Sequence, residues 1–311
     1  MNKKIAGVGE ILWDVYPNAR FLGGATANYA FHAGQLGDIP IIVSRVGEDA
    51  AGDEILREVR KRGADTAFIQ RDPEKPTGQV RIRLDARGVP SFECAQDEAF
   101  DYLTWTPELG RLATEVDAVL FGTLAQRLSP ARQTIQKFVS RAAKGLKLFD
   151  PNLREFPPEL RPVVERSLQL TDILKLNEDE LISLRALLEK KTLGETDFFQ
   201  WLLEEFSLTG VCLTLGEKGA CFYAPEGQFY SPGVRIEPVD TTGSGDAFIA
   251  ALTVKWLAGA SLEESLDFAN GVAAFVATLP GAVPRYTEDE VRSFLAVHRE
   301  RTVDPQWAAK K

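Results

Sequence analysis

The sequence predicts an α/β fold, in which a doubly wound and mostly parallel sheet is covered by helices on both faces. The chain has 311 residues, enough for a large core, and its 44% hydrophobic and 26% charged residues are typical of a globular protein. From residue 118 onward, short apolar runs alternate with helical segments. Polar clusters follow several of these runs directly. Because parallel strands end at one edge of a sheet, we expect the clusters to form one composite site.

The secondary-structure elements can be predicted in chain order from apolar runs and helix signals. Buried strands are expected at 5–8, 39–46, 118–121, 146–149, 173–176 and 211–215, with an alternating strand at 10–16 and a hairpin at 220–230. Helices are expected up to residue 36 and at 51–62, 130–144, 159–170, 197–206, 247–257, 262–277 and 287–301, with one more after residue 180. This alternation indicates a single domain over residues 1–311.

One part of the chain interrupts the alternation of strands and helices. Residues 78–85 alternate apolar and polar side chains, residues 86–88 form a turn signal, and residues 91–94 return, which predicts a solvent-facing antiparallel hairpin. We expect a small β subdomain built from approximately 10–22 and 76–103. Such an appendage could serve as a lid over the site.

Composition narrows the range of partners. The formal net charge is −9 and basic residues do not cluster, which argues against nucleic acid and anionic membranes. The sequence shows no apolar run long enough to span a bilayer and no signal-peptide pattern, and its three cysteines have no metal-binding spacing, so a cytoplasmic protein is expected. The two histidines, His32 and His298, leave little material for a serine-hydrolase triad or a histidine-rich zinc site.

The most informative stretch is residues 239–248, where Gly243, Ser244, Gly245 and Asp246 precede an apolar helical run. A glycine turn at a helix start points free N–H groups outward, and the helix dipole favours an anion there. A carboxylate beside that anion is repulsive, unless it takes a proton from the nucleophile that attacks the anion. The pairing predicts phosphoryl transfer. The alternative is an aspartate that merely caps a helix after a glycine-rich turn.

Other phosphate-binding signatures are missing. The sequence has no Gly-x-x-x-x-Gly-Lys-Ser/Thr motif and no His-Arg-Asp or Asp-Phe-Gly motif, which excludes P-loop enzymes and protein kinases. No Gly-x-Gly-x-x-Gly follows the first strand, so a dinucleotide-binding dehydrogenase is a weak alternative.

Residues 240–248 resemble the C-terminal motif of the PfkB/ribokinase family of carbohydrate kinases. Residues 23–30, followed by glycines 37 and 47, resemble its N-terminal motif. The chain departs from the family at Thr26, where proline is frequent, and at Ser244, where alanine is commoner. The likeness runs from the first strand to Pro284, and its start is most similar to bacterial fructokinases. It implies a ribokinase-like fold, an ATP-dependent sugar kinase, and a homodimer formed through the lid.

The resemblance also implies individual roles. Asp246 would deprotonate the sugar hydroxyl, and the N–H groups of Gly243, Ser244 and Gly245 would hold the charge on the transferring phosphoryl group. Sugar contacts are implied for Asp14, Gly23, Gly24, Asn28 and Arg154. Nucleotide contacts are implied for Asn177, Thr214, Gly216, Gly219 and Asn270. Glu180 would hold Mg²⁺ through water, and Asp240, Thr242 and Gly281 would hold a monovalent cation, expected to be K⁺. Arg154 could instead form a structural ion pair with Asp150.

The acceptor is expected to be a small sugar, with D-fructose phosphorylated to fructose 6-phosphate as the leading interpretation. Ribose and 2-keto-3-deoxygluconate are the alternatives within the family. The keto acid needs a cation for its carboxylate, which Arg81, Arg83 or Arg87 could supply from the lid. A different class of function is also open, namely a sugar- or nucleotide-binding protein of this fold without turnover. Such a protein would have another residue in place of Asp246 or Glu180, and both residues are present here.

Overall fold

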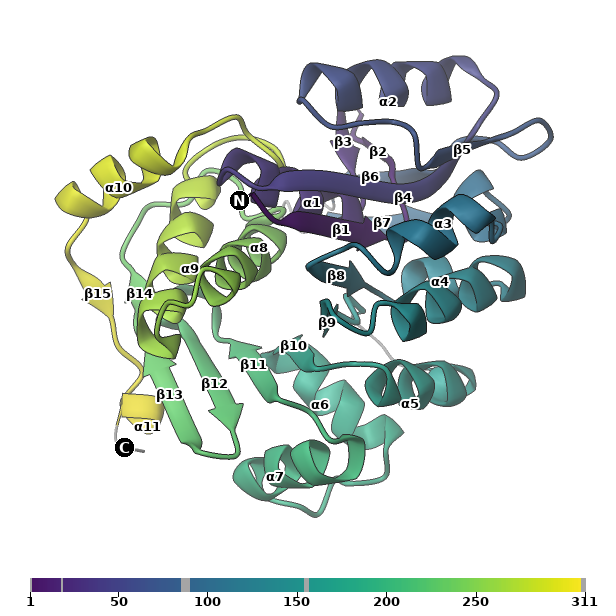
Figure 1. The fold of residues 1–311 in the computed structure, drawn as a ribbon. Coiled ribbons are helices and arrows are strands. Elements are labelled where there is room, and N and C mark those ends of the chain that lie inside the picture. Colours follow the sequence, from purple (N-terminus) through teal and green to yellow (C-terminus); the bar gives the residue numbers. More distant parts are fainter. Residues whose placement is uncertain (1, 18, 85–89, 154–156, 309–311) are drawn as a thin grey trace.

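The computed structural model describes residues 2–17, 19–84, 90–153 and 157–308. Its centre is a nine-stranded sheet, mostly parallel, with the two strands at one edge antiparallel to their neighbours (Figure 1). In spatial order the strands are β13 (Gly227–Ser231), β12 (Ala220–Ala224), β11 (Gly210–Thr214), β10 (Ile173–Asn177), β9 (Leu146–Phe149), β8 (Ala118–Phe121), β1 (Lys4–Val8), β4 (Ile39–Gly47) and β5 (Ile69–Asp72). The predicted doubly wound architecture is confirmed.

Helices cover both faces of this sheet (Figure 1). One face carries α3 (Pro107–Leu112), α4 (Ser129–Arg141), α5 (Arg161–Gln169), α6 (Glu178–Leu187) and α7 (Glu195–Phe206). The other carries α1 (Ala25–Gln35), α8 (Ser244–Leu257), α9 (Leu262–Ala277) and α10 (Glu288–Val297). The helix α2 (Ala50–Lys61) packs near β4 and β5, and the short α11 (Pro305–Ala308) lies close to the C-terminus.

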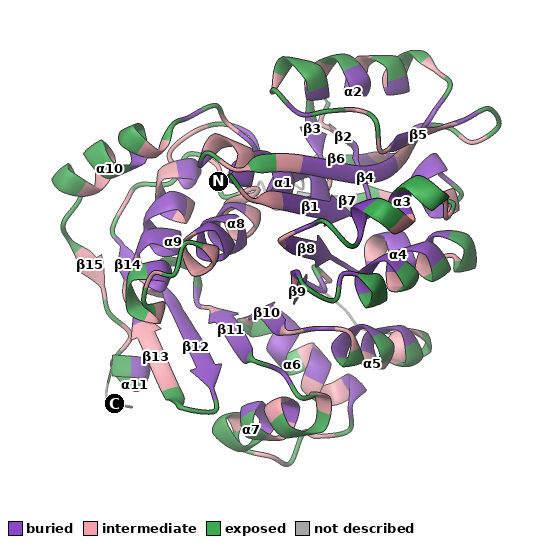
Figure 2. Cartoon of the chain, viewed as in Figure 1, coloured by how far each residue is buried: buried purple, intermediate pink, exposed green. Residues whose placement is uncertain are grey.

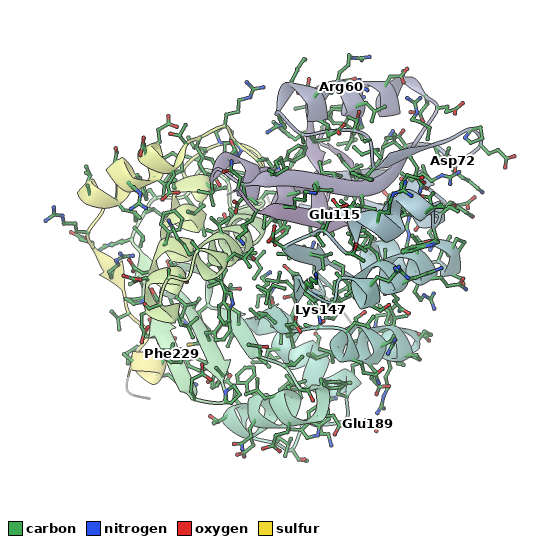
Figure 3. All side chains as sticks on the ribbon, viewed as in Figure 1. Arg60, Asp72, Glu115, Lys147, Glu189 and Phe229 are labelled. Carbon is green, nitrogen blue, oxygen red and sulfur yellow. The ribbon has the colours of Figure 1, made fainter. Side chains whose placement is uncertain are left out.

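Burial follows this layering. The sheet strands β1 and β8 are largely buried, because helices cover both of their faces (Figure 2). The helix α8 is buried continuously from residue 247 to 254, since it lies between the sheet, α1 and α9. Charged side chains such as Arg60 and Glu189 point outward at the periphery (Figure 3). Because α8 is packed against the sheet and two helices, the position of its first turn is fixed relative to the core.

A second, small sheet stands apart from the main one, with strand order β3 (Arg20–Gly23), β2 (Leu12–Val15), β6 (Gln79–Leu84) and β7 (Pro90–Cys94). The predicted antiparallel pairing of β6 with β7 is confirmed. The structure adds that β6 pairs in parallel with β2, which itself pairs with β3. Both segments of the predicted β subdomain therefore belong to one sheet.

Some elements differ from expectation. The last helix was expected to reach residue 301 but ends at Val297, because the backbone of His298 turns away and its ring stacks on Phe294. The chain then forms β15 (Arg301–Thr302), which pairs with β14 (Gly233–Val234). The strand β5 and the helix α3 were not predicted. In the part of the chain that the structure describes, no helix combines the length and apolar character needed to cross a bilayer.

Candidate active site

The glycine turn at the start of α8 is shaped by close packing against the chain near Ala282. Gly243 has a φ of 75°, and a Cβ placed on it would lie 2.2 Å from the carbonyl oxygen of Ala282. That carbonyl is held in turn by Nε2 of the buried His32, at 3.0 Å. Only glycine satisfies both the left-handed backbone and the close contact. The contact with Ala282 gives the buried His32 a structural role beside the turn.

Asp246 lies in the first turn of α8 and meets the first turn of α1. Nδ2 of Asn28 donates a hydrogen bond to Oδ2 of Asp246 over 2.9 Å, although the two residues are 218 positions apart. Burial, helped by the nearby carboxylates of Asp150 and Glu10, raises the pKa of Asp246 to about 7, against the opposing effects of Asn28 and Lys175. A carboxylate with this pKa is a far better proton acceptor than an ordinary aspartate and is still substantially ionised at neutral pH.

The position of Asn28 depends on how α1 begins. The carboxylate of the buried Glu10 accepts hydrogen bonds from the backbone of Ala25 and Thr26, and burial raises its pKa to about 7. The hydroxyl of Thr26 donates to the carbonyl oxygen of Glu10 at 2.9 Å. Thr26, where the chain departs from the family motif, therefore ties the helix start to the end of β1. This arrangement holds Asn28 toward Asp246.

Asp14 and Gly23 face each other in the small sheet. A Cβ on Gly23 would lie 2.1 Å from Oδ2 of Asp14, so the glycine leaves room for the carboxylate. Burial raises the pKa of Asp14 to about 6. Tyr16, two residues further along the chain from Asp14, interacts with the side chain of Thr242. The small sheet thus reaches the loop that precedes α8.

A buried ion pair lies beside the glycine turn. Nζ of Lys175, in β10, is 2.8 Å from Oδ2 of Asp150, which directly follows β9. A Cβ on Gly245 would lie 3.2 Å from the same Nζ. Burial alone would lower the pKa of Lys175, but the carboxylates of Asp150, Glu180 and Asp246 raise it, so the lysine stays charged. Sequence reasoning missed Lys175; the signal was a lysine inside the apolar run of a predicted strand, two positions before Asn177.

The residues expected to serve the nucleotide begin where β10 and β11 end. Asn177 and Glu180 form a reciprocal capping box at the start of α6, with both hydrogen bonds at 2.8 Å. Thr214 is the register partner of Asn177 on the neighbouring strand. Burial raises the pKa of Glu180, against the attraction of the Lys175 ammonium. The carboxylate of Glu180 therefore helps to cap the start of α6.

The loop from β11 to β12 contains the other predicted nucleotide residues. Gly216 starts a single 3₁₀ turn and Gly219 ends it. Asn270, on α9, is nearly buried, and its side-chain amide donates to the carbonyl oxygen of Ser231 at 3.0 Å. That same carbonyl lies against Gly219. Asn270 supports this loop from behind, and its contact with adenine or ribose stays a prediction.

Asp240 connects two loops near α8. Its carboxylate oxygens accept one hydrogen bond each from the backbone N–H groups of Thr242, at 2.9 Å, and Gly281, at 3.0 Å. The three residues predicted to hold a monovalent cation are therefore neighbours. In the described ranges, no group of three or more His, Cys, Asp or Glu side chains is placed to hold a metal ion. Arg154 lies outside the described residues, so neither of its predicted roles is tested.

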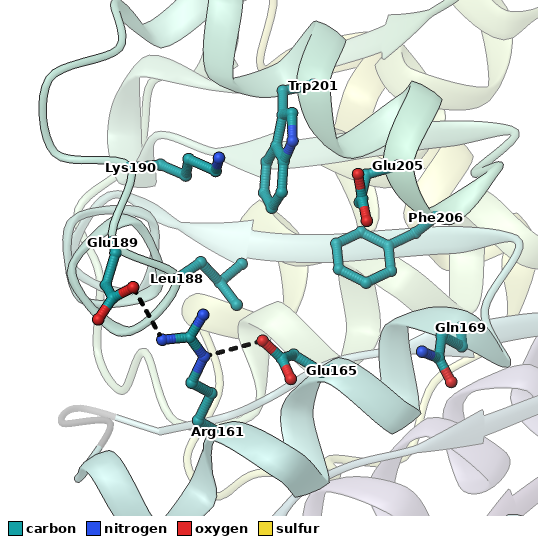
Figure 4. A pocket seen from close by; sticks show the side chains of 9 residues that line it. All are labelled: Arg161, Glu165, Gln169, Leu188, Glu189, Lys190, Trp201, Glu205 and Phe206. Carbon is teal, nitrogen blue, oxygen red and sulfur yellow. Dashed lines mark hydrogen bonds and ion pairs between the residues drawn. The ribbon is translucent and has the colours of Figure 1, made fainter.

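The structure also contains hollows away from the predicted site residues. One of about 400 Å³ lies between α5, the end of α6 and α7 (Figure 4). In it Arg161 pairs with Glu165 and Glu189, and the ammonium of Lys190 lies 4.6 Å from the ring centre of Trp201. None of the predicted site residues lines it.

Comparisons with known proteins agree with this fold. The model of the pfkB family carbohydrate kinases matches residues 18–288. A Pyrococcus horikoshii sequence, provisionally named a sugar kinase, is 32% identical over 310 residues and covers 93% of this chain and 95% of its own length. Fructokinase-1 of Oryza sativa subsp. japonica is 30% identical over 284 residues, with 86% of each chain covered. The chain belongs to the pfkB family of carbohydrate kinases.

A solved structure extends the likeness to three dimensions. Fructokinase from Vibrio cholerae, with fructose, ADP and a calcium ion bound, matches with a TM-score of 0.79 and 26% identity. The match covers 94% of this chain and 99% of that one. The predicted ribokinase-like fold and the predicted likeness to fructokinases are both confirmed.

Proposed function

We propose that this chain is an ATP-dependent kinase that transfers the γ-phosphate to a hydroxyl of D-fructose, giving fructose 6-phosphate, with Asp246 as the base. The observation that carries the proposal is the 2.9 Å hydrogen bond between Asn28 and Asp246. It joins the residue expected to bind the sugar to the residue expected to deprotonate it, from opposite ends of the sequence. A helix-capping aspartate alone would not need this partner.

The proposed chemistry uses the chain's own groups at each step. Asp246, with its pKa raised by burial to about 7, accepts the proton of the attacking hydroxyl. Asn28 fixes the direction of the carboxylate, and its amide oxygen accepts no hydrogen bond from the described residues. The backbone N–H groups at the start of α8 then stabilise the charge on the transferring phosphoryl group. Ser244 N–H also donates to Thr241 within the turn, at 3.2 Å, which keeps the turn rigid.

The donor set around this turn fits ATP with Mg²⁺. Glu180 is nearly buried, and one carboxylate oxygen is engaged by the Asn177 N–H, so Mg²⁺ would be held through water beside it. When bound, Mg²⁺ would neutralise phosphate charge. Both carboxylate oxygens of Asp240 already accept hydrogen bonds from backbone N–H groups, so K⁺ would rely mainly on loop carbonyls near Gly281. Nucleotide contacts remain proposed for Asn177, Thr214, Gly216, Gly219 and Asn270.

Fructose is favoured over the alternatives by two considerations. The family relatives include fructokinases, one of which is solved with fructose bound. The proposed acceptor groups, Asp14 and Asn28, are hydroxyl-binding rather than carboxylate-binding groups. The carboxylate of 2-keto-3-deoxygluconate requires a cation. Of the three arginines that could supply it, Arg81 is exposed on β6, and the side chains of Arg83 and Arg87 lie outside the described part of the chain. Ribose stays an alternative acceptor.

The small sheet is proposed to act as a lid, as one β subdomain of a single catalytic domain. Tyr16 already interacts with Thr242, and the ring of Phe21 lies against Gly281, so the sheet contacts the loops beside the glycine turn. Covering the site would exclude water and suppress ATP hydrolysis. A homodimer through this sheet is proposed on the same basis. The side chain of Phe21 is 40% exposed there, which suits a contact with a second copy.

The test is a coupled ADP-release assay with Mg²⁺ and K⁺ over fructose, ribose, glucose and 2-keto-3-deoxygluconate, with a control lacking sugar. We expect fructose to give the highest kcat/KM, with little ADP release in the control. A preference for another sugar would refute the fructose assignment only. If no sugar stimulates ADP release while ATP still binds, the chain is a binding protein without turnover and the proposal fails.

A further inference from the structure

The buried pair of Lys175 and Asp150 is unusual for the strand in which it lies. Lys175 interrupts the buried run between Leu174 and Leu176, and its side chain is only 7% exposed. The Asp150 side chain is 2% exposed, and the two charged atoms are 2.8 Å apart. Removing two charges from water is costly, and a buried pair is often no more stabilising than apolar residues of the same size. Stability alone therefore does not explain the pair.

Its position suggests another reason. The ammonium lies next to Gly245, at 3.2 Å from where a Cβ would be, and so directly beside the turn proposed to hold the phosphoryl group. It acts electrostatically on both Asp246 and Glu180. The charged pair thus lies beside the proposed site.

The charged and polar groups that act on Asp246 come from four elements. Asn28 approaches from α1, Glu10 from the end of β1, Asp150 from the end of β9 and Lys175 from β10. Two of them are carboxylates, which favour a protonated Asp246, while Lys175 favours the ionised form. Among the described residues, this lysine is the positive charge that offsets them.

We propose that Lys175, held by Asp150 beside the glycine turn, is a positioning residue that sets the charge balance of the site and keeps Asp246 ionised to act as the base. The inference rests on the proposed function, because it assigns a reason for the base to be ready at neutral pH. Lys175 acts through Asp246 and is not a ligand of ATP or sugar. Asp150 acts in the opposite direction, since its charge opposes ionisation of Asp246.

Lys175 and Asp150 are therefore expected to have opposite effects on the ionisation of Asp246. Lys175→Met should move the acid limb of the kcat/KM pH profile up by about one pH unit, and Asp150→Asn should move it down by a similar amount. The double variant leaves no lone buried charge, which guards against misfolding. The acid limb of its pH profile should lie between those of the two single variants. A purely structural pair would give losses of activity without shifts in opposite directions.

A second readout does not depend on turnover. Protein labelled with ¹³C at the aspartate carboxyls reports the titration of Asp246, whose signal is identified by its loss in Asp246→Asn. The same upward and downward shifts are expected there. If no sugar stimulates ADP release, the proposed function fails while this titration still decides the inference.

Two results would overturn the inference. One is an unchanged titration of Asp246 in the Asp150→Asn protein. The other is a large loss of ATP affinity in Lys175→Met with an unchanged pH profile, which would make Lys175 a direct phosphate ligand. ATP affinity is measured by isothermal titration calorimetry on the same four proteins.

Discussion

Replacing Gly243 with alanine should disable the site through two separable effects. The backbone φ of 75° costs a non-glycine residue about 1–2 kcal/mol. The added Cβ would also lie 2.2 Å from the carbonyl oxygen of Ala282, which cannot retreat easily because His32 holds it at 3.0 Å. The glycine turn must therefore move, by up to about 1 Å to reach an ordinary contact. A displacement of that size costs about 10²-fold in catalysis when it misplaces a reacting group.

The chain offers a matched control at the other end of the same helix. Gly259 has a φ of 78°, and a Cβ on it would meet nothing within 4 Å. Gly259→Ala should thus lose about 1 kcal/mol of unfolding free energy with kcat/KM unchanged. Gly243→Ala should lose more stability and about 10²-fold in kcat/KM, measured by urea unfolding and the ADP-release assay. Near-normal turnover in Gly243→Ala would refute the proposed packing of the turn.

Further predictions concern pH and buried contacts. The acid limb of wild-type kcat/KM should fall near pH 7, because activity needs ionised Asp246; a limb near pH 4 would contradict this. Asn28→Ala removes a hydrogen bond that favours the ionised carboxylate, so the limb should move to higher pH and activity at pH 6 should fall more than at pH 8. His32 bonds Tyr286 at 2.9 Å as well as Ala282, so His32→Phe should cost about 1–3 kcal/mol in urea unfolding, and a neutral result would count against its structural role.

Raised pKa values also predict how stability responds to pH. Folding raises the pKa of the Asp246 carboxyl from 3.8 to about 7, so this group makes the protein less stable as pH rises through that interval. Asp246→Asn removes the penalty. Its melting temperature should exceed that of wild type at pH 8 and match it at pH 4. A variant that is less stable than wild type at pH 8 would contradict the desolvation of this group.

Much of the fold could be predicted because its strands are nearly pure apolar runs. The boundaries of β8 and β9 were predicted without error, since β8 is entirely apolar and buried and β9 contains only one polar residue, Lys147. By contrast, β5 has the sequence Ile-Gln-Arg-Asp, and its edge position allows three polar side chains in a row. The end of α10 was missed because a single ring stacking, His298 on Phe294, replaces the usual glycine signal.

The candidate site was only partly predictable. Strand ends and glycine turns indicated Asp246 and Asn28, but their direct contact depends on α1 packing against α8 across 218 residues. The structure pairs Asp150 with Lys175, a residue that the sequence reasoning did not single out. Local sequence could not reveal this, because the pairing follows from the adjacency of β9 and β10 in the sheet.

The central claim is that Asp246 removes a proton from a sugar hydroxyl, and one comparison tests it most directly. Fructose-dependent ADP release is measured for wild type and Asp246→Asn at pH 7.5–8, with ATP affinity measured in parallel by calorimetry. Asparagine keeps the shape of the side chain but cannot accept the proton. We predict a loss of at least about 10³-fold in kcat with ATP affinity little changed. Turnover near the wild-type rate in Asp246→Asn would contradict the account.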